Sequence, residues 1–196
     1  MKLKISQVGE SVLRQPTRPL AVEEILSPPI QQLIELMCET MQDAPGVGLA
    51  APQVGLPLQL AVIEDRLEYH REIPAEQLAA RQRVPIPFHV LINTQLSITQ
   101  ASEVAFFEGC LSLTGFMALV PRALAVHVQC MNERGEPRVI EAEGWYARIL
   151  QHEIDHLNGT LYLDRMAARS FMTSMNYTRL WQEKAVEQVR AELGLS

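Results

Sequence analysis

Apolar and polar residues along the chain follow patterns that predict helices near both ends and strands between them. Between residues 29 and 42 the apolar side chains recur every three or four positions, which is typical of an amphipathic helix. Residues 145–157 show a second helical pattern, and Asn158 and Gly159 after it are typical of a helix end. A third, polar helix is predicted over about 176–192.

Short apolar and β-branched runs in the middle of the chain predict strands at residues 58–63, 88–93, 103–107, 123–130 and 137–143. A loop rich in glycine and proline is expected at residues 44–55, and the charged 65–87 segment reads as a surface excursion. We therefore expect an α+β fold. In it, antiparallel or mixed sheets pack around the helix at residues 145–157, with further helices at the N- and C-terminal ends.

Composition narrows the class of protein. A chain of 196 residues is the length of one domain, with room for a short terminal element. Its net charge of −6 disfavours a general nucleic-acid-binding role, because phosphate contacts need a basic surface. Three cysteines are too few and too irregular for a disulfide framework, and no apolar run is long enough to span a bilayer. These features predict a cytoplasmic protein without membrane contact.

The most informative motif lies in the second predicted helix. His152 and His156 are four residues apart, so their imidazoles project from one face and can bind a single metal ion. Glu153 lies beside them, within reach of a water molecule at that metal. This is the H-E-x-x-H arrangement, in which the glutamate serves as general base.

A catalytic metal site of this kind needs a third protein ligand, and the residues alone do not identify it. A metzincin would have histidine where this chain has Tyr162, and a thermolysin-like site would need a glutamate downstream. The alternative is Cys110, which follows a glycine at the end of an apolar run. The candidates are Cys110, Glu183, Glu187 and Glu192, whereas Cys38 and Cys130 are expected to be packing residues.

Three segments together resemble the peptide deformylases. They are the G-V-G-L-A-A-P-Q motif at residues 46–53, the E-G-C-L-S motif at 108–112 and the Q-H-E-I-D-H motif at 151–156. Their order and spacing are similar to those of that family, and the resemblance extends from about residue 3 to 166. It implies a catalytic domain over residues 1–166, a C-terminal helical extension over 167–196, and a bacterial, cytoplasmic enzyme.

The resemblance implies a hydrolase that removes formate from the N-formylmethionine of nascent chains. One divalent metal ion would be held by Cys110, His152 and His156, with water in the fourth position and Glu153 as general base and acid. Iron(II) is favoured in the cell, and zinc, nickel or cobalt are its frequent replacements. The side-chain amide of Gln53 and the backbone N–H of Leu111 would stabilise the oxyanion.

Substrate contacts are expected around the same motifs. Gly46 and Gly48 would let the backbone approach an extended peptide closely. The methionine pocket is expected from Val47, Phe106, Trp145 and Ile149, and Arg148 and Asp155 either support the histidines or lie on the surface. Many bacterial relatives have a proline and an arginine where this chain has Thr114 and Met117, a difference that concerns the peptide beyond methionine.

Two other functions are predicted less strongly by these residues. A zinc endopeptidase would use a third ligand other than Cys110, and a non-catalytic binder of peptide N-termini would be expected to lack Glu153 or Gln53. The extension mixes cations and acids evenly, so a solvated helix is expected there, with a transient ribosome contact as the alternative.

Overall fold

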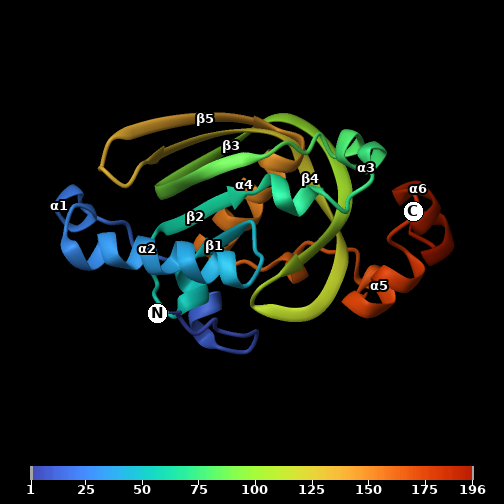
Figure 1. The fold of residues 1–196 in the computed structure, drawn as a ribbon, viewed down its shortest axis with the longest axis horizontal. Helices are drawn as coiled ribbons and strands as arrows, with labels where there is room; N and C mark the ends of the chain where they lie inside the picture. The colour runs from blue at the N-terminus through green and yellow to red at the C-terminus, as the bar shows by residue number, and fades with distance from the viewer. Residues whose placement is uncertain (1, 196) are drawn as a thin grey trace.

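The computed structural model describes residues 2–195. Its main element is an antiparallel sheet with the strand order β1-β2-β3-β4-β5, and the short β6 pairs with β4 (Figure 1). The strands are β1 (Gly48–Ala50), β2 (Leu60–Asp65), β3 (Ile86–Cys110), β4 (Leu113–Met131), β5 (Pro137–Glu143) and β6 (Met172–Thr173). The α-helices are α1 (Val22–Ile25), α2 (Pro28–Asp43), α3 (Ala75–Ala80), α4 (Gly144–Leu157), α5 (Ser174–Leu180) and α6 (Val186–Leu193). The predicted α+β class is confirmed.

Both faces of the sheet near β1 and β2 are covered by helices. Successive side chains of a strand point to opposite faces, and β2 uses both faces for burial. Leu60 and Val62 pack in a cluster with α2, whereas Ala61 and Ile63 pack in a second cluster with α4. The run of apolar residues in β2 therefore follows from its position between two helices. Its side chains pack against α4 on one face of the sheet and against α2 on the other.

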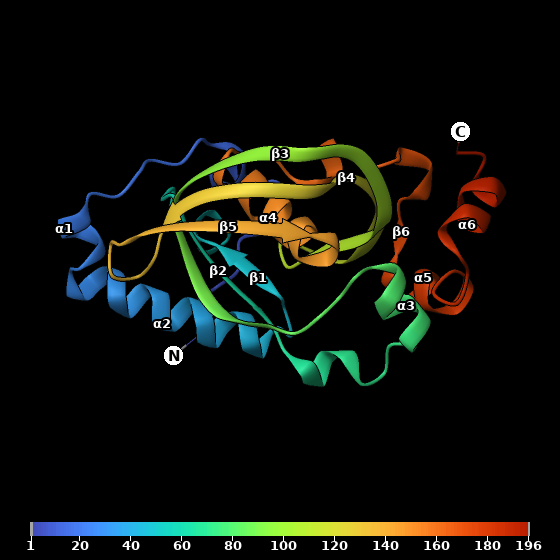
Figure 2. The ribbon, with the colours of Figure 1, turned by 90° about the horizontal axis from the view of Figure 1, so that it is seen from above.

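The two longest strands, β3 and β4, form a curled ribbon (Figures 1 and 2). The prediction of separate strands at 88–93 and 103–107 is wrong, because β3 runs without interruption from Ile86 to Cys110. Residues 95–103 are largely exposed and carry mostly polar side chains. The sequence there therefore lacks the apolar pattern from which a strand would be predicted. Several register shifts between β3 and β4 mark irregularities that increase the bend of the ribbon. Because β3 bends, its C-terminal end reaches α4.

The C-terminal extension also differs from its prediction. The single helix expected over 176–192 is in fact two helices, α5 and α6, separated by residues 181–185. The extension is not simply solvated, because Val189 is 1% exposed and packs in a cluster with Phe107 of β3 and Leu119 of β4. Both views place α3, α5 and α6 at the end of the molecule opposite α1 (Figures 1 and 2).

The 65–87 segment is an excursion, as predicted, but it is anchored at both of its ends. Asp65 is fully buried and accepts two hydrogen bonds from Arg83, at 2.7 and 2.8 Å. Between them lies the short helix α3. Among residues 2–195, none of the helices has the length and apolar character that crossing a membrane requires.

Candidate active site

The structure brings together the three residues expected to bind a metal. The ligand atoms of Cys110, His152 and His156 all lie within 4.8 Å of one another, and Cys110 Sγ is 3.2 Å from His156 Nε2. Cys110 ends β3, while the two histidines lie one turn apart on α4. One sulfur and two imidazole nitrogens form a donor set that suits zinc or iron(II), so these residues fit a divalent ion.

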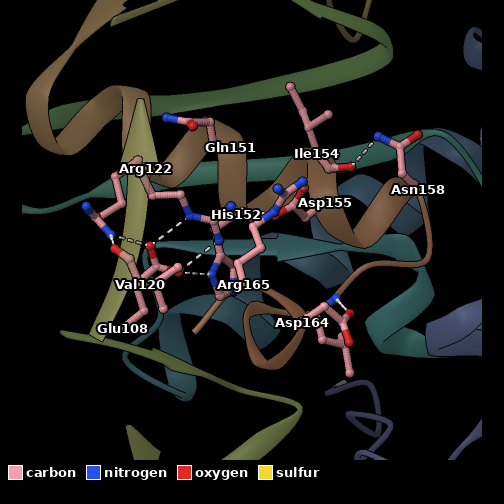
Figure 3. A network of polar contacts seen from close by, with 12 residues as sticks. Glu108, Val120, Arg122, Gln151, His152, Ile154, Asp155, Asn158, Asp164 and Arg165 are labelled. Atoms are coloured by element: carbon pink, nitrogen blue, oxygen red, sulfur yellow. Dashed lines mark hydrogen bonds and ion pairs between the residues drawn. The ribbon is translucent and has the colours of Figure 1, made fainter. Parts of the chain in front are cut away.

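His152 is oriented by a buried carboxylate. Its Nδ1 lies 2.9 Å from Oε2 of Glu108, which leaves Nε2 for the metal position (Figure 3). Glu108 also accepts two hydrogen bonds of 3.0 Å from Arg122 and one of 2.6 Å from Arg148. Burial alone would raise the pKa of Glu108, but His152 and Arg122 hold it well below its usual range. Glu108 therefore stays negatively charged, and it contacts the His152 ring at Nδ1, on the side opposite the metal position.

The network extends along α4 through a second acid. Asp155 forms an ion pair with Arg122 and accepts hydrogen bonds of 2.6 and 2.7 Å from Arg165 (Figure 3). We call Glu108, Arg122, Arg148, His152, Asp155 and Arg165 the Glu108 network. Both Arg148 and Asp155 are buried in it, so the structure places neither on the surface. Among residues 2–195, the Nδ1 atom of His156 has no comparable partner.

Glu153 projects into the same space from α4. Its side chain is buried, its Oε2 has no hydrogen-bond partner in the described part of the chain, and burial raises its pKa to about 7. Gly48 leaves room for it, since a Cβ atom at this position would lie 2.2 Å from Glu153 Oε1. The glycine is thus required by the closeness of β1 to this carboxylate.

Gln53 is held in one orientation by its neighbours. It is 1% exposed, and its Oε1 accepts a 2.8 Å hydrogen bond from the backbone N–H of Ala50. That bond directs Nε2 toward Cys110 Sγ, at 3.5 Å, and toward Ser112 Oγ, at 3.2 Å. The amide N–H groups therefore face the metal position.

Gln53, Cys110, His152 and Glu153 line a cavity of about 550 Å³, whereas His156 is buried beneath it and is not a lining residue. Of the residues predicted for the site, those that line it are Gly46, Val47, Gly48, Gln53, Cys110, Leu111, Trp145, Ile149, His152 and Glu153. Phe106 does not line it and instead borders a smaller hollow, although its ring packs 6.3 Å from that of Trp145. Phe107 lines the cavity in its place, because neighbouring residues of a strand face opposite ways.

Comparison with known proteins agrees with this geometry. The family model described as polypeptide deformylase matches residues 2–171. The chain belongs to the polypeptide deformylase family. It is 47% identical to the chloroplastic peptide deformylase 1A of Solanum lycopersicum over 172 residues, which is 88% of this chain and 62% of the relative. This chain therefore spans somewhat less than two thirds of that plant relative's length.

This chain is also similar to a bacterial peptide deformylase and to a solved peptide deformylase structure. Peptide deformylase 1 of Streptomyces coelicolor is 42% identical over 192 residues, which cover 98% of this chain and 86% of that protein. The Met-Ala-Ser-bound crystal structure of a class I type b peptide deformylase from Acinetobacter baumannii has a TM-score of 0.75 and 30% identity. That match covers 85% of this chain and 99% of the bacterial one.

The alternative candidates for the third metal ligand do not lie in the cluster of Cys110, His152 and His156. Glu183, Glu187 and Glu192 lie on the extension outside the Cys-His-His cluster, and Glu192 pairs with Lys184. Tyr162 is 2% exposed, and its ring stacks 6.3 Å from that of His152. Within the described chain, Cys110 is thus the third donor that the geometry supplies.

Several residues of the site were not predicted from the sequence. Arg122 and the role of Glu108 were missed, although the unusual glutamate before a strand-end cysteine was a usable signal. The cavity also extends to the 65–87 segment and to the extension, which no motif indicated. The residues that line it from these two segments are Ile73, Pro74, Gln77, Arg81, Arg83, Ser174, Tyr177 and Gln182.

Proposed function

We propose that this chain hydrolyses the formyl amide of N-formylmethionyl peptides and nascent chains, releasing formate and a free amino terminus. The observation that carries the proposal is the buried carboxylate of Glu153, whose Oε2 has no hydrogen-bond partner among residues 2–195, beside the Cys110, His152 and His156 donor set. Membership of the polypeptide deformylase family supports the substrate class, and the Met-Ala-Ser ligand of the Acinetobacter baumannii structure supports methionine as the first residue.

Cys110, His152 and His156 would hold one divalent ion, iron(II) in the cell and zinc, nickel or cobalt as replacements. When bound, such an ion supplies Lewis acidity and lowers the pKa of water near it. A thiolate ligand donates more charge than imidazole, so this site would be softer than a site with three histidines. Glu108 would keep the His152 ring in one tautomer, with its Nε2 lone pair free.

Glu153 would move the proton during hydrolysis. Its carboxylate accepts a proton from the attacking water and then donates it to the amide nitrogen as the carbon–nitrogen bond breaks. Burial raises the pKa of Glu153, so its carboxylate accepts a proton more readily than the carboxylate of an exposed glutamate does. The products are formate and the amine, so no other reactant is needed.

Gln53 and Leu111 would stabilise the oxyanion that forms on the formyl oxygen. The Gln53 amide is already oriented by Ala50, so it needs little reorganisation when charge develops. The backbone N–H of Leu111 would be the second donor. Val47, Trp145 and Ile149 line the apolar part of the cavity and would hold the methionine side chain. Gly46 and Gly48 would allow the peptide backbone to approach.

Formate release distinguishes this function from its alternatives. The purified, anaerobically prepared chain is given a formyl-Met peptide, its acetylated analogue and an unblocked, unfolded protein. Deformylase activity predicts formate from the first and no cleavage of the others. Cleavage of internal bonds would indicate an endopeptidase, and binding of peptides without turnover would indicate a non-catalytic role. Contact between the extension and the ribosome stays a prediction, to be tested by co-sedimentation.

A further inference from the structure

The outer wall of the cavity is built where the 65–87 segment meets the C-terminal extension. Gln77 of α3 donates a 3.0 Å hydrogen bond to the backbone carbonyl of Gln182, and both residues line the cavity. Tyr177 of α5 completes this wall, and its ring packs 4.6 Å from that of Phe107. A peptide that extends beyond the methionine pocket toward α3 and α5 would meet this wall.

Arg81 is the cation in the wall that lacks an acidic partner. Its guanidinium carbon lies 5.3 Å from the ring centre of Trp145 and 5.8 Å from that of Phe106, and its Nη2 donates to Gln77 Oε1 at 3.3 Å. No carboxylate among residues 2–195 forms an ion pair with it. The two aromatic rings and the glutamine therefore hold the guanidinium in place without neutralising it.

The other two arginines of the cavity differ in this respect. Arg83 is paired with the buried Asp65, and Arg148 donates to Glu108 at 2.6 Å. Arg83 and Arg148 lie 5.1 and 5.9 Å from the ring centre of Trp145, so this ring contacts all three arginines, of which Arg81 alone lacks an acidic partner among the described residues. The wall next to the methionine pocket thus has a net positive charge, although the whole chain carries −6.

We propose that Arg81 is a specificity-determining residue that binds a carboxylate side chain, aspartate or glutamate, in the first residues after the formylmethionine. This inference rests on the proposed deformylase function. A nascent chain has no free terminal carboxylate, so an acidic side chain is the substrate group that can supply the charge. A planar guanidinium held by aromatic rings suits two-point contact with such a group.

The test uses four amidated peptides, which have no terminal carboxylate. Two carry glutamate, as formyl-Met-Glu-Ala-Ser amide and formyl-Met-Ala-Glu-Ser amide, and two carry glutamine instead. For the wild-type chain, kcat/KM should favour glutamate roughly three- to fivefold at one of these positions, mainly through KM, as a partly exposed ion pair allows. Arg81→Gln should lower kcat/KM for the glutamate peptides to about the value for the glutamine peptides, which removes the preference.

Arg71→Gln is the matched control, because it removes the same charge from an exposed site in the same segment that does not line the cavity. It should keep the preference. Equal kcat/KM for glutamate and glutamine peptides in the wild type would overturn the inference while leaving deformylation intact. Loss of the preference in Arg71→Gln as well would show a general charge effect and also overturn it. No formate from any peptide would overturn both proposals.

Discussion

The inner and outer parts of the cavity are stabilised in different ways. The inner part consists of β3, β4 and α4 and is held by the Glu108 network, whose acids and arginines are buried except for Arg165. The outer part consists of α3 and of α5 with the residues that follow it; both helices are largely exposed, and Gln77 of α3 is joined to this segment by its hydrogen bond with Gln182. The family match ends at residue 171, before α5 begins. We infer that the inner part determines the chemistry and the outer part the choice of peptide.

The largest effect is expected from breaking the inner network. Glu108→Ala leaves Arg122 and Arg148 buried without their shared partner, which should lower the free energy of unfolding by about 3–5 kcal/mol. Glu68→Ala removes an acid that pairs with Arg66 at the exposed edge of the 65–87 segment and should cost less than about 1 kcal/mol. Urea unfolding of both variants measures the contrast. Similar losses would show that the buried ion pairs of the inner part stabilise the fold no more than an exposed ion pair does.

An intermediate effect is expected from moving Glu153 without changing it. Gly48→Ala adds a methyl group that would lie 2.2 Å from Glu153 Oε1, so the carboxylate must shift. We expect kcat to fall about 100-fold, as for other small displacements of reacting groups, while metal content stays normal. Steady-state kinetics with metal analysis tests this. An unchanged kcat would show that the position of Glu153 is not critical.

A small effect is expected at the outer wall. Tyr177→Ala removes the ring that packs against Phe107, and KM for a formylated tetrapeptide should rise roughly two- to tenfold with kcat retained. Met175→Ala, on the same helix but 74% exposed, is the control and should leave both constants unchanged. A fall in kcat for Tyr177→Ala would mean that the outer part also positions the reacting groups.

Elements with a clear apolar period could be predicted from the sequence. The helix expected at 29–42 is confirmed as α2, which buries one face, and the one at 145–157 is confirmed as α4, which is buried on nearly all sides. The strand pattern fails where the β3–β4 ribbon is exposed, since polar side chains conceal the strand there. The break between α5 and α6 was also missed. Docking on Phe107 and Leu119 is a tertiary effect that local pattern does not contain.

The site shows the same limit. The H-E-x-x-H spacing predicted that His152 and His156 share a face, and the family resemblance indicated Cys110 and Gln53, all of which lie together in the structure. Their supports could not be predicted in the same way. Arg122 reaches Glu108 only because β3 and β4 pair across the ribbon, and Arg81 reaches Trp145 only because the 65–87 segment folds back. Such contacts depend on topology rather than on spacing.

Metal analysis of anaerobically purified protein shows whether Cys110, His152 and His156 hold one divalent metal ion. The wild-type chain should contain about one ion per molecule, and Cys110→Ser should lose it together with formate release. Cys38→Ser, a change on the half-buried face of α2, should keep both. A Cys110→Ser variant with full metal content would show that another residue is the third ligand and that Cys110 does not bind the metal.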